Sequence, residues 1–143
     1  MSKDKEFPAG VMDKGVYPAN KKGHTYMPAP YHGSKTHTTR GGRKTKWTVD
    51  QNGQHYIFNY ADERDWMDNI ARGLFSFYKK CKESIGSNGE RLAFFPKPSN
   101  DFDPWHGYPV FSDEMEDMNL VEKWAQDGEI DVTTKQRLLR QAI

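Results

Sequence analysis

Prolines and glycines interrupt the first 43 residues so often that neither a helix nor a strand of ordinary length fits between them. Proline fixes φ and lacks a backbone N–H, and no helical or alternating apolar spacing runs through this segment. A chain of 143 residues has room for one core and little for a second. We therefore predict an extended, irregular basic arm over 1–43 and a single α+β domain over 44–143. The interrupting residues are Pro8, Pro18, Pro28, Pro30, Gly10, Gly15, Gly23, Gly33, Gly41 and Gly42.

Large apolar side chains precede three of these prolines at ten-residue intervals, in the sequences FPA (7–9), YPA (17–19) and MPA (27–29). A residue before proline favours extended backbone, so a straight arm would space these anchors about 30 Å apart. Because disordered tails are poor in aromatic residues, the pattern indicates that the arm lies on a surface. Three surfaces remain open: the protein's own body, a neighbouring copy and a separate partner.

Charge is divided between the two parts of the chain. Residues 1–47 hold 10 Lys/Arg and 3 Asp/Glu, a balance of +7, whereas residues 48–143 hold 11 Lys/Arg and 17 Asp/Glu, a balance of −6. The two balances give the net charge of +1. The division predicts that the basic arm contacts an anionic surface, which is either the protein's own acidic body or an external partner.

The sequence KWTVDQNGQHYIFNY (46–60) predicts a β-hairpin over about 44–60. Asn52-Gly53 is the preferred pair for a two-residue type I′ turn, and the flanking residues alternate between apolar and polar. In that register one face of the hairpin carries the large apolar side chains and needs a cover. Those side chains are Trp47, Val49, Tyr56, Phe58 and Tyr60.

A long helix over about 62–85 is predicted as that cover. Its apolar residues recur at helical spacing, its first turn is acidic, and Lys79, Lys80 and Lys82 lie near its end before Gly86. Gly73 in its middle would permit close packing. The apolar positions are Trp66, Ile70, Leu74, Phe77, Cys81 and Ile85.

The sequence after residue 85 predicts one more strand and two short helices. Prolines end a strand within 91–98, and an aromatic-rich loop follows over 100–111. A helix over about 112–127 precedes Gly128 as its C′ residue, and a last helix over about 133–142 begins with a Thr133/Gln136 capping box. The predicted fold class is α+β: a small antiparallel sheet centred on the hairpin, the long helix and a C-terminal helical hairpin.

Composition narrows the class of protein. Hydrophobic residues make up 35% of the chain and aromatic residues 13%, which predicts a modest core built from large rings. The single cysteine, Cys81, excludes an internal disulfide framework and is expected to be a buried thiol. No apolar stretch has the length of a signal peptide or membrane span, so we expect an intracellular, cytoplasmic protein. No cofactor and no metal site are expected.

The stretch YHGSKTHTTRGGRKTKW (31–47) interleaves cations with aromatic rings and carries no acidic side chain. Cations that follow phosphates and rings that stack on bases suit RNA or single-stranded nucleic acid, and the same cations suit an acidic protein surface. A second corner, WHG at 105–107, predicts a packed ring beside an exposed histidine, with Gly107 supplying a positive φ for the turn. The predicted contact residues are Tyr31, His32, Lys35, His37, Arg40, Arg43, Lys44, Lys46, Trp105 and His106.

These features favour a noncatalytic interaction protein, such as an inhibitor, adaptor or accessory subunit. One alternative is a small metal-independent nuclease or toxin domain, in which histidines beside those cations act as acid and base. A second alternative is a helix-turn-helix regulator that uses 127–141, although the acidic residues of the preceding helix would repel a DNA duplex. The sequence assigns no residue a catalytic role.

Overall fold

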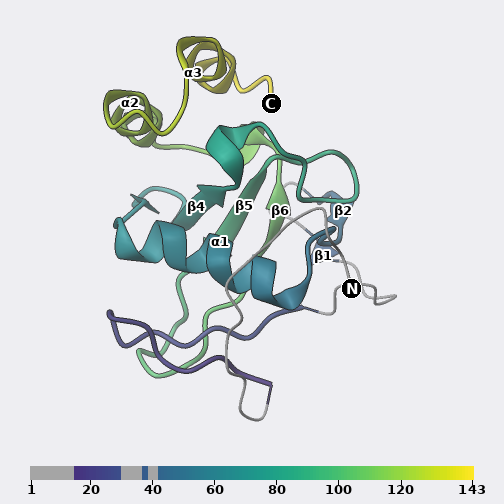
Figure 1. Cartoon of the computed structure of the whole chain (residues 1–143), viewed down its shortest axis with the longest axis vertical. Coiled ribbons are helices and arrows are strands. Elements are labelled where there is room, and N and C mark those ends of the chain that lie inside the picture. Colours follow the sequence, from purple (N-terminus) through teal and green to yellow (C-terminus); the bar gives the residue numbers. More distant parts are fainter. Residues whose placement is uncertain (1–14, 30–36, 39–41) are drawn as a thin grey trace.

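A four-stranded antiparallel sheet forms the centre of the protein (Figure 1). The structure is a computed structural model that describes residues 15–29, 37–38 and 42–143, and for His37 the backbone alone. The strands are neighbours in chain order, β3-β4-β5-β6, and each is joined to the next without a crossover. Their bounds are β3 Met67–Asp68, β4 Gly73–Phe77, β5 Leu92–Pro96 and β6 Tyr108–Val110. The predicted α+β class is confirmed.

Helix α1 (Gln51–Glu63) crosses one face of this sheet (Figure 1). The Ser76 hydroxyl on β4 donates a 2.7 Å hydrogen bond to the Ile57 carbonyl, and the Phe58 and Phe95 rings meet edge to face at 5.4 Å. Ser76 is fully buried, so this bond satisfies a hydroxyl that would otherwise be costly to bury. The contact fixes the helix against the middle of the sheet.

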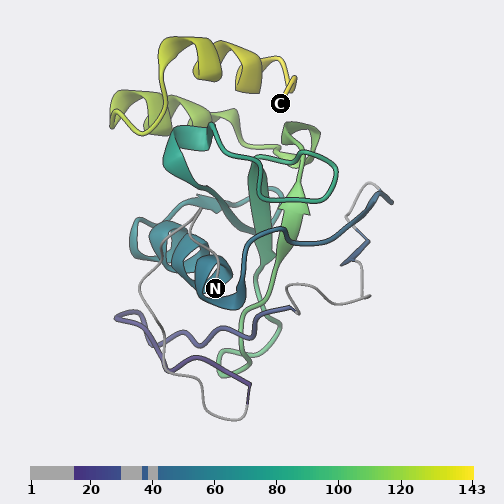
Figure 2. The same ribbon diagram turned by 45° about the vertical axis from the view of Figure 1, so that its right-hand side comes forward.

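Helices α2 (Met118–Gln126) and α3 (Val132–Leu139) pair at one end of the sheet (Figures 1 and 2). Trp124 joins them to the core, with its ring 5.3 Å from Trp66 and 4.9 Å from Phe77. The shorter elements are β1 His37–Thr38, β2 Lys44–Thr45, and the 3₁₀ turns η1 Lys79–Cys81 and η2 Ser112–Glu114. Within the described residues, no helix has the length and apolar character needed to cross a membrane.

Residues 15–29 lie against the opposite end of the molecule from α2 and α3, beside the loop before β6 (Figure 1). Tyr17 and Tyr26 are buried in the core, and the Tyr17 N–H donates to the Tyr26 carbonyl at 2.9 Å. The Trp105 N–H donates to Thr25, and the Met27 N–H donates to Trp105, both at 2.8 Å. This part of the predicted arm therefore lies on the protein's own body, and it doubles back instead of running straight. Residues 7–9 are outside the described chain.

The predicted hairpin over 44–60 is wrong, because Asn52 and Gly53 lie in the first turn of α1. Asp50 is the N-cap, and its carboxylate accepts the Gly53 N–H at 2.8 Å. That bond satisfies one of the orphan donors of the helix start, and Gly53 needs no positive φ. The buried positions follow a helical period, whereas the alternation that suggested a strand depended on rings at 56 and 60 that are only half-buried. The buried residues of α1 are Gly53, Gln54, Ile57, Phe58, Ala61 and Asp62.

The predicted helix over 62–85 is also wrong, because this segment forms β3, β4 and η1 with sharp turns between them. All five residues of β4 are buried, so both faces of the strand are covered and no alternation marks it. Residues with positive φ, including Asp65 and Arg72, interrupt any helix, and Ile70 is 62% exposed. Gly73 does permit a close approach, but in a strand: a Cβ there would lie 2.6 Å from the Phe94 ring and the Phe95 carbonyl oxygen.

The predictions for the C-terminal half are mostly confirmed. The strand within 91–98 is β5, Gly128 follows α2 with a φ of +74°, and α2 and α3 form the expected helical hairpin. The helix predicted over about 112–127 is shorter than expected, because 112–114 form the turn η2 and α2 begins at Met118. The start of α3 differs from the prediction: Asp131 is the N-cap and accepts the Thr134 N–H at 2.8 Å, so Thr133 and Gln136 form no capping box. The predicted loop over 100–111 contains β6, which pairs with β5 at the sheet edge.

Replacing Asp50, the N-cap of α1, tests whether a helix begins there. We expect Asp50→Ala to lower the free energy of unfolding by about 1 kcal/mol, because the Gly53 N–H loses its acceptor. Urea unfolding monitored by tryptophan fluorescence measures the change. Gln51→Ala, one residue into the helix, is the matched control and should be nearly neutral. Equal stability of the two variants would show that Asp50 does not cap a helix.

Candidate functional site

The sequence-predicted contact residues fall into two groups in the structure. Arg43, Lys44 and Lys46 lie in or beside β2, and Trp105 and His106 lie in the loop before β6. The two groups are joined where the Trp47 indole N–H donates to the Gly107 carbonyl at 3.0 Å. The remaining predicted residues fall outside the described side chains: Tyr31, His32, Lys35, His37 and Arg40.

The segment 44–47 alternates strictly between solvent and core. Lys44 and Lys46 are exposed, whereas Thr45 and Trp47 are 1% exposed. Alternation along extended backbone therefore presents both lysines on one face. The backbone is held from outside the segment, because Asn88 Nδ2 donates to the Lys44 carbonyl at 2.8 Å and the Lys46 N–H donates to the Ser87 hydroxyl at 3.1 Å.

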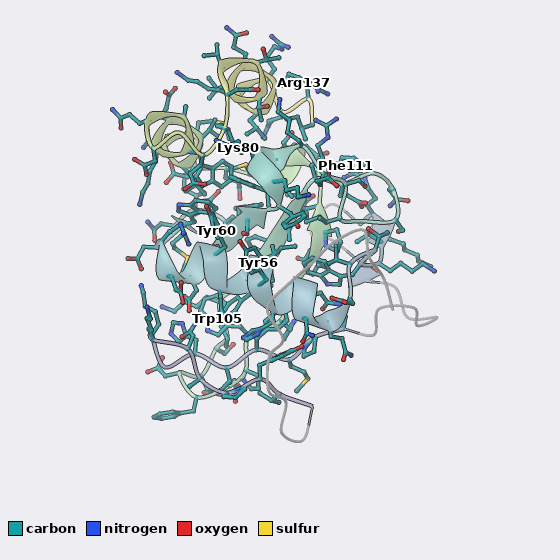
Figure 3. All side chains as sticks on the ribbon, in the orientation of Figure 1. Tyr56, Tyr60, Lys80, Trp105, Phe111 and Arg137 are labelled. Carbon is teal, nitrogen blue, oxygen red and sulfur yellow. The ribbon has the colours of Figure 1, made fainter. Side chains whose placement is uncertain are left out.

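Arg43 is committed to the protein's own surface. Its guanidinium donates to Asp113 at 3.0 Å and lies 4.8 Å from the Phe111 ring centroid. The hydrogen bond from this guanidinium to Asp113 raises the pKa of Arg43 above its ordinary value. The Arg43–Asp113 pair thus attaches the segment before β2 to η2, the turn that follows β6 and Phe111 (Phe111 is labelled in Figure 3).

The WHG corner combines a packed ring with an exposed histidine, as predicted. Trp105 is 4% exposed and packs 5.6 Å from Phe58, while His106 is exposed. The role predicted for Gly107 is wrong, because its φ is not positive. It is required for close packing, since a Cβ would lie 2.3 Å from the Phe95 ring and 2.5 Å from the Phe94 carbonyl oxygen. Trp105 is therefore mostly buried, and it also lines the cleft that contains His24.

A polar network that sequence reasoning missed joins residues 15–29 to α1. His24 Nδ1 lies 2.8 Å from Asp62 Oδ2, and Asn20 Nδ2 donates to the same oxygen at 2.6 Å. Asp62 is 4% exposed, whereas 31% of the His24 side chain is exposed. A buried carboxylate on one imidazole nitrogen fixes the tautomer and leaves the other nitrogen able to accept a proton. The two residues are 38 positions apart, and no local pattern announces the pair.

The His24–Asp62 pair lines a cleft of about 250 Å³. Lys22 and Lys97 contribute cations to this cleft, and Asp65 and Asp101 contribute carboxylates. Lys22 forms an ion pair with Asp65, which lowers the pKa of that carboxyl. The cleft therefore offers a proton acceptor in a site of mixed charge.

No other protein identifies the chemistry of these residues. No protein-family model, curated protein sequence or solved structure matches the chain. Among residues 15–29, 37–38 and 42–143, no three His, Cys, Asp or Glu side chains are grouped to hold a metal ion.

A second histidine in the same region is held neutral. The His55 ring stacks on Tyr17 at 3.9 Å, and its Nε2 accepts a hydrogen bond from Asn59 Nδ2 at 3.0 Å. Asn20 donates to Asn59 Oδ1 at 2.9 Å, which fixes the orientation of that amide. Desolvation lowers the pKa of His55 from 6.5 to about 4. Neutral His55 thus forms part of the contact between residues 15–29 and α1.

This neutral histidine predicts acid sensitivity. In the unfolded chain His55 binds a proton below about pH 6.5, whereas in the folded protein it does so only near pH 4. Its contribution to stability is present above pH 6.5 and is lost as the pH falls toward 4. We expect the free energy of unfolding, measured in urea at pH 7.5 and 4.5, to fall more for the natural protein than for His55→Gln. An equal fall in both proteins would contradict the assignment.

Proposed function

We propose that the protein is a noncatalytic interaction protein that binds nucleic acid or an acidic protein partner through its basic leading segment, with Lys44 and Lys46 as contact residues. The observation that carries the proposal is that the three cations in and beside β2 differ in whether a carboxylate pairs with them. Arg43 is paired with Asp113, whereas Lys44 and Lys46 are exposed and have no carboxylate partner among the described residues.

Two features support this role for the lysines. Buried Thr45 and Trp47 hold the segment in the core, so the two cations project from a fixed backbone. Ordering a binding segment before the partner arrives reduces the entropy lost on binding. The body behind this segment is acidic, with 17 Asp/Glu against 11 Lys/Arg over 48–143, so its net charge does not attract a polyanion and binding depends on local groups of cations.

Charge reversal at these lysines is the direct test. We expect Lys44→Glu/Lys46→Glu to weaken binding to a fluorescein-labelled single-stranded RNA, or to an acidic peptide, by about tenfold or more at low salt. The slope of log K against log salt should also fall by about 2 for the RNA. Fluorescence anisotropy from 50 to 300 mM salt measures both quantities.

The matched control is Lys123→Glu/Lys135→Glu, which makes the same change in net charge on α2 and α3. If the control weakens binding as much as the β2 variant, the effect is one of overall charge and Lys44 and Lys46 are not the contact. Binding that does not respond to salt would reject an electrostatic interface altogether.

The His24–Asp62 pair favours a second candidate, metal-independent RNA cleavage. In this reaction His24 accepts the 2′-hydroxyl proton, the 2′-oxygen attacks phosphorus, and the 5′-oxygen leaves with a proton from Lys97 or water. The products are a 2′,3′-cyclic phosphate and a 5′-hydroxyl. Asp65 and Asp101 in the same cleft weaken its attraction for phosphate, and this candidate therefore ranks second.

Cleavage is tested with labelled RNA in EDTA. The second candidate predicts cyclic-phosphate products from the natural protein, a loss of about 100-fold or more in rate for His24→Asn, and no cleavage of DNA, which lacks the 2′-hydroxyl. His55→Gln, which changes a histidine outside the lining of this cleft, is the control. RNA that stays intact with the natural protein would exclude this activity and leave the binding proposal standing. No observation in the structure favours the helix-turn-helix alternative.

A further inference from the structure

The turn after β4 holds three consecutive residues in the left-handed region, with φ of 49° at Lys79, 58° at Lys80 and 65° at Cys81. None of them is glycine or asparagine. Left-handed backbone costs conformational free energy for residues other than glycine. A run of three such residues therefore needs a stabilising interaction or a function to offset that cost. At Cys81, complete burial of the side chain offsets part of this cost. Lys79 and Lys80 are exposed, so burial does not explain why lysine stands at these two positions.

The turn places Lys80 at a cleft of about 280 Å³ between α1 and the turn that joins α2 to α3. Two tyrosines one helical turn apart, Tyr56 and Tyr60, form the α1 side of this cleft, with ring centroids 6.0 Å apart. Figure 3 shows both tyrosines on the same face of the molecule as Lys80. The cleft is smaller than most sites for drug-sized ligands, and this size suits one planar group beside the rings.

The charges around this cleft favour an anion. Lys80 Nζ donates to the Gly128 carbonyl at 3.1 Å, and no carboxylate pairs with it among the described residues. The Arg64 guanidinium lies 3.5 Å from the Tyr60 ring centroid. Glu129 is the one acidic residue among the described residues that line the cleft, and it already accepts the Tyr60 hydroxyl at 2.8 Å and lies 3.9 Å from Arg64. Lys79 adds a further exposed cation.

We propose that this cleft is a binding site for a single-stranded nucleic acid, with the phosphates on Lys79 and Lys80 and a base against Tyr56 and Tyr60. Proteins that bind single strands with little sequence preference combine aromatic rings, which stack on bases, with cations, which contact phosphates. This cleft has both features. The inference rests on the proposed function and deepens it, since it names nucleic acid as the partner and adds a second contact surface to Lys44 and Lys46. In this proposal the left-handed turn is kept because it places Lys80 in the lining of the cleft, with exposed Lys79 next to it in the chain and its Nζ 5.4 Å from the Tyr78 ring centroid.

Substituting glycine for both lysines of the turn distinguishes a loss of binding from a loss of stability. Lys79→Gly/Lys80→Gly relieves the unfavourable backbone and removes both cations, so we expect Tm to rise by about 5 °C while affinity for a fluorescein-labelled ten-nucleotide single-stranded RNA falls about tenfold. Lys79→Arg/Lys80→Arg, which keeps the charge, should retain affinity within about twofold. Lys123→Gln/Lys135→Gln removes two positive charges elsewhere and should have a smaller effect than the glycine variant.

Base contact is tested with the same strand made abasic, which keeps the phosphates and should bind about fivefold or more weakly to the natural protein. Equal affinity of the glycine variant and the natural protein would overturn the inference, and so would equal affinity for the abasic strand. If Lys44→Glu/Lys46→Glu binds RNA normally while the glycine variant does not, the role of β2 fails and this site stands. The reverse result rejects this site and leaves the β2 contact in place.

Discussion

The Phe95 ring on β5 is the contact on which the rest of the fold depends. Its centroid lies 5.4 Å from Phe58 on α1, 5.8 Å from Tyr26 and 6.0 Å from Trp47. One ring thus joins the sheet to the helix that covers it, to the segment before that helix and to residues 15–29. Aromatic side chains bury far more surface than aliphatic ones, which is how a chain with 35% hydrophobic residues still encloses a core.

The same ring explains why glycine is needed at a position that makes no turn. The backbone at Gly107 passes so close to Phe95 that a methyl group would overlap the ring. This closeness lets the Gly107 carbonyl reach the Trp47 indole N–H, and Trp47 in turn holds the segment that exposes Lys44 and Lys46. The packing around Phe95 is therefore linked, through two contacts, to the lysines proposed to bind a partner.

Sequence reasoning succeeded for α2, α3 and β5, and it failed for α1 and for β4, a strand with both faces covered. Helices α2 and α3 show the expected spacing because their outer sides meet water, and prolines mark the end of β5. Strand β4 is buried on both faces, so Leu74 and Phe77 fitted a helical stripe by coincidence. Asn52-Gly53 indicated a hairpin turn, but Asp, Asn and Gly are also common where a helix begins. The structure uses Asp50 as an N-cap, with its carboxylate bound to the Gly53 N–H.

The candidate sites divide in the same way. Lys44 and Lys46 could be found because a run of cations without acids is visible in one stretch, although their separation from Arg43 depends on Asp113, 70 positions away. The His24–Asp62 pair and the cleft beside Tyr60 could not be found. Each joins residues that become neighbours only after folding. In addition, no sequence pattern predicts left-handed backbone at Lys79 and Lys80.

The two lysine pairs share a physical property that a flexible basic tail lacks. A long side chain on ordered backbone loses only its own rotamer freedom when it meets a phosphate, whereas a residue in a mobile segment also loses backbone freedom of about 1 to 2 kcal/mol. Asn88 and Ser87 hold the backbone at Lys44 and Lys46, and the bond from the Cys81 N–H to the Tyr78 carbonyl closes the turn at Lys79 and Lys80. Binding of a polyanion by these four lysines, as proposed, is compatible with an acidic body, because charges beyond about 8 Å are largely screened at physiological salt.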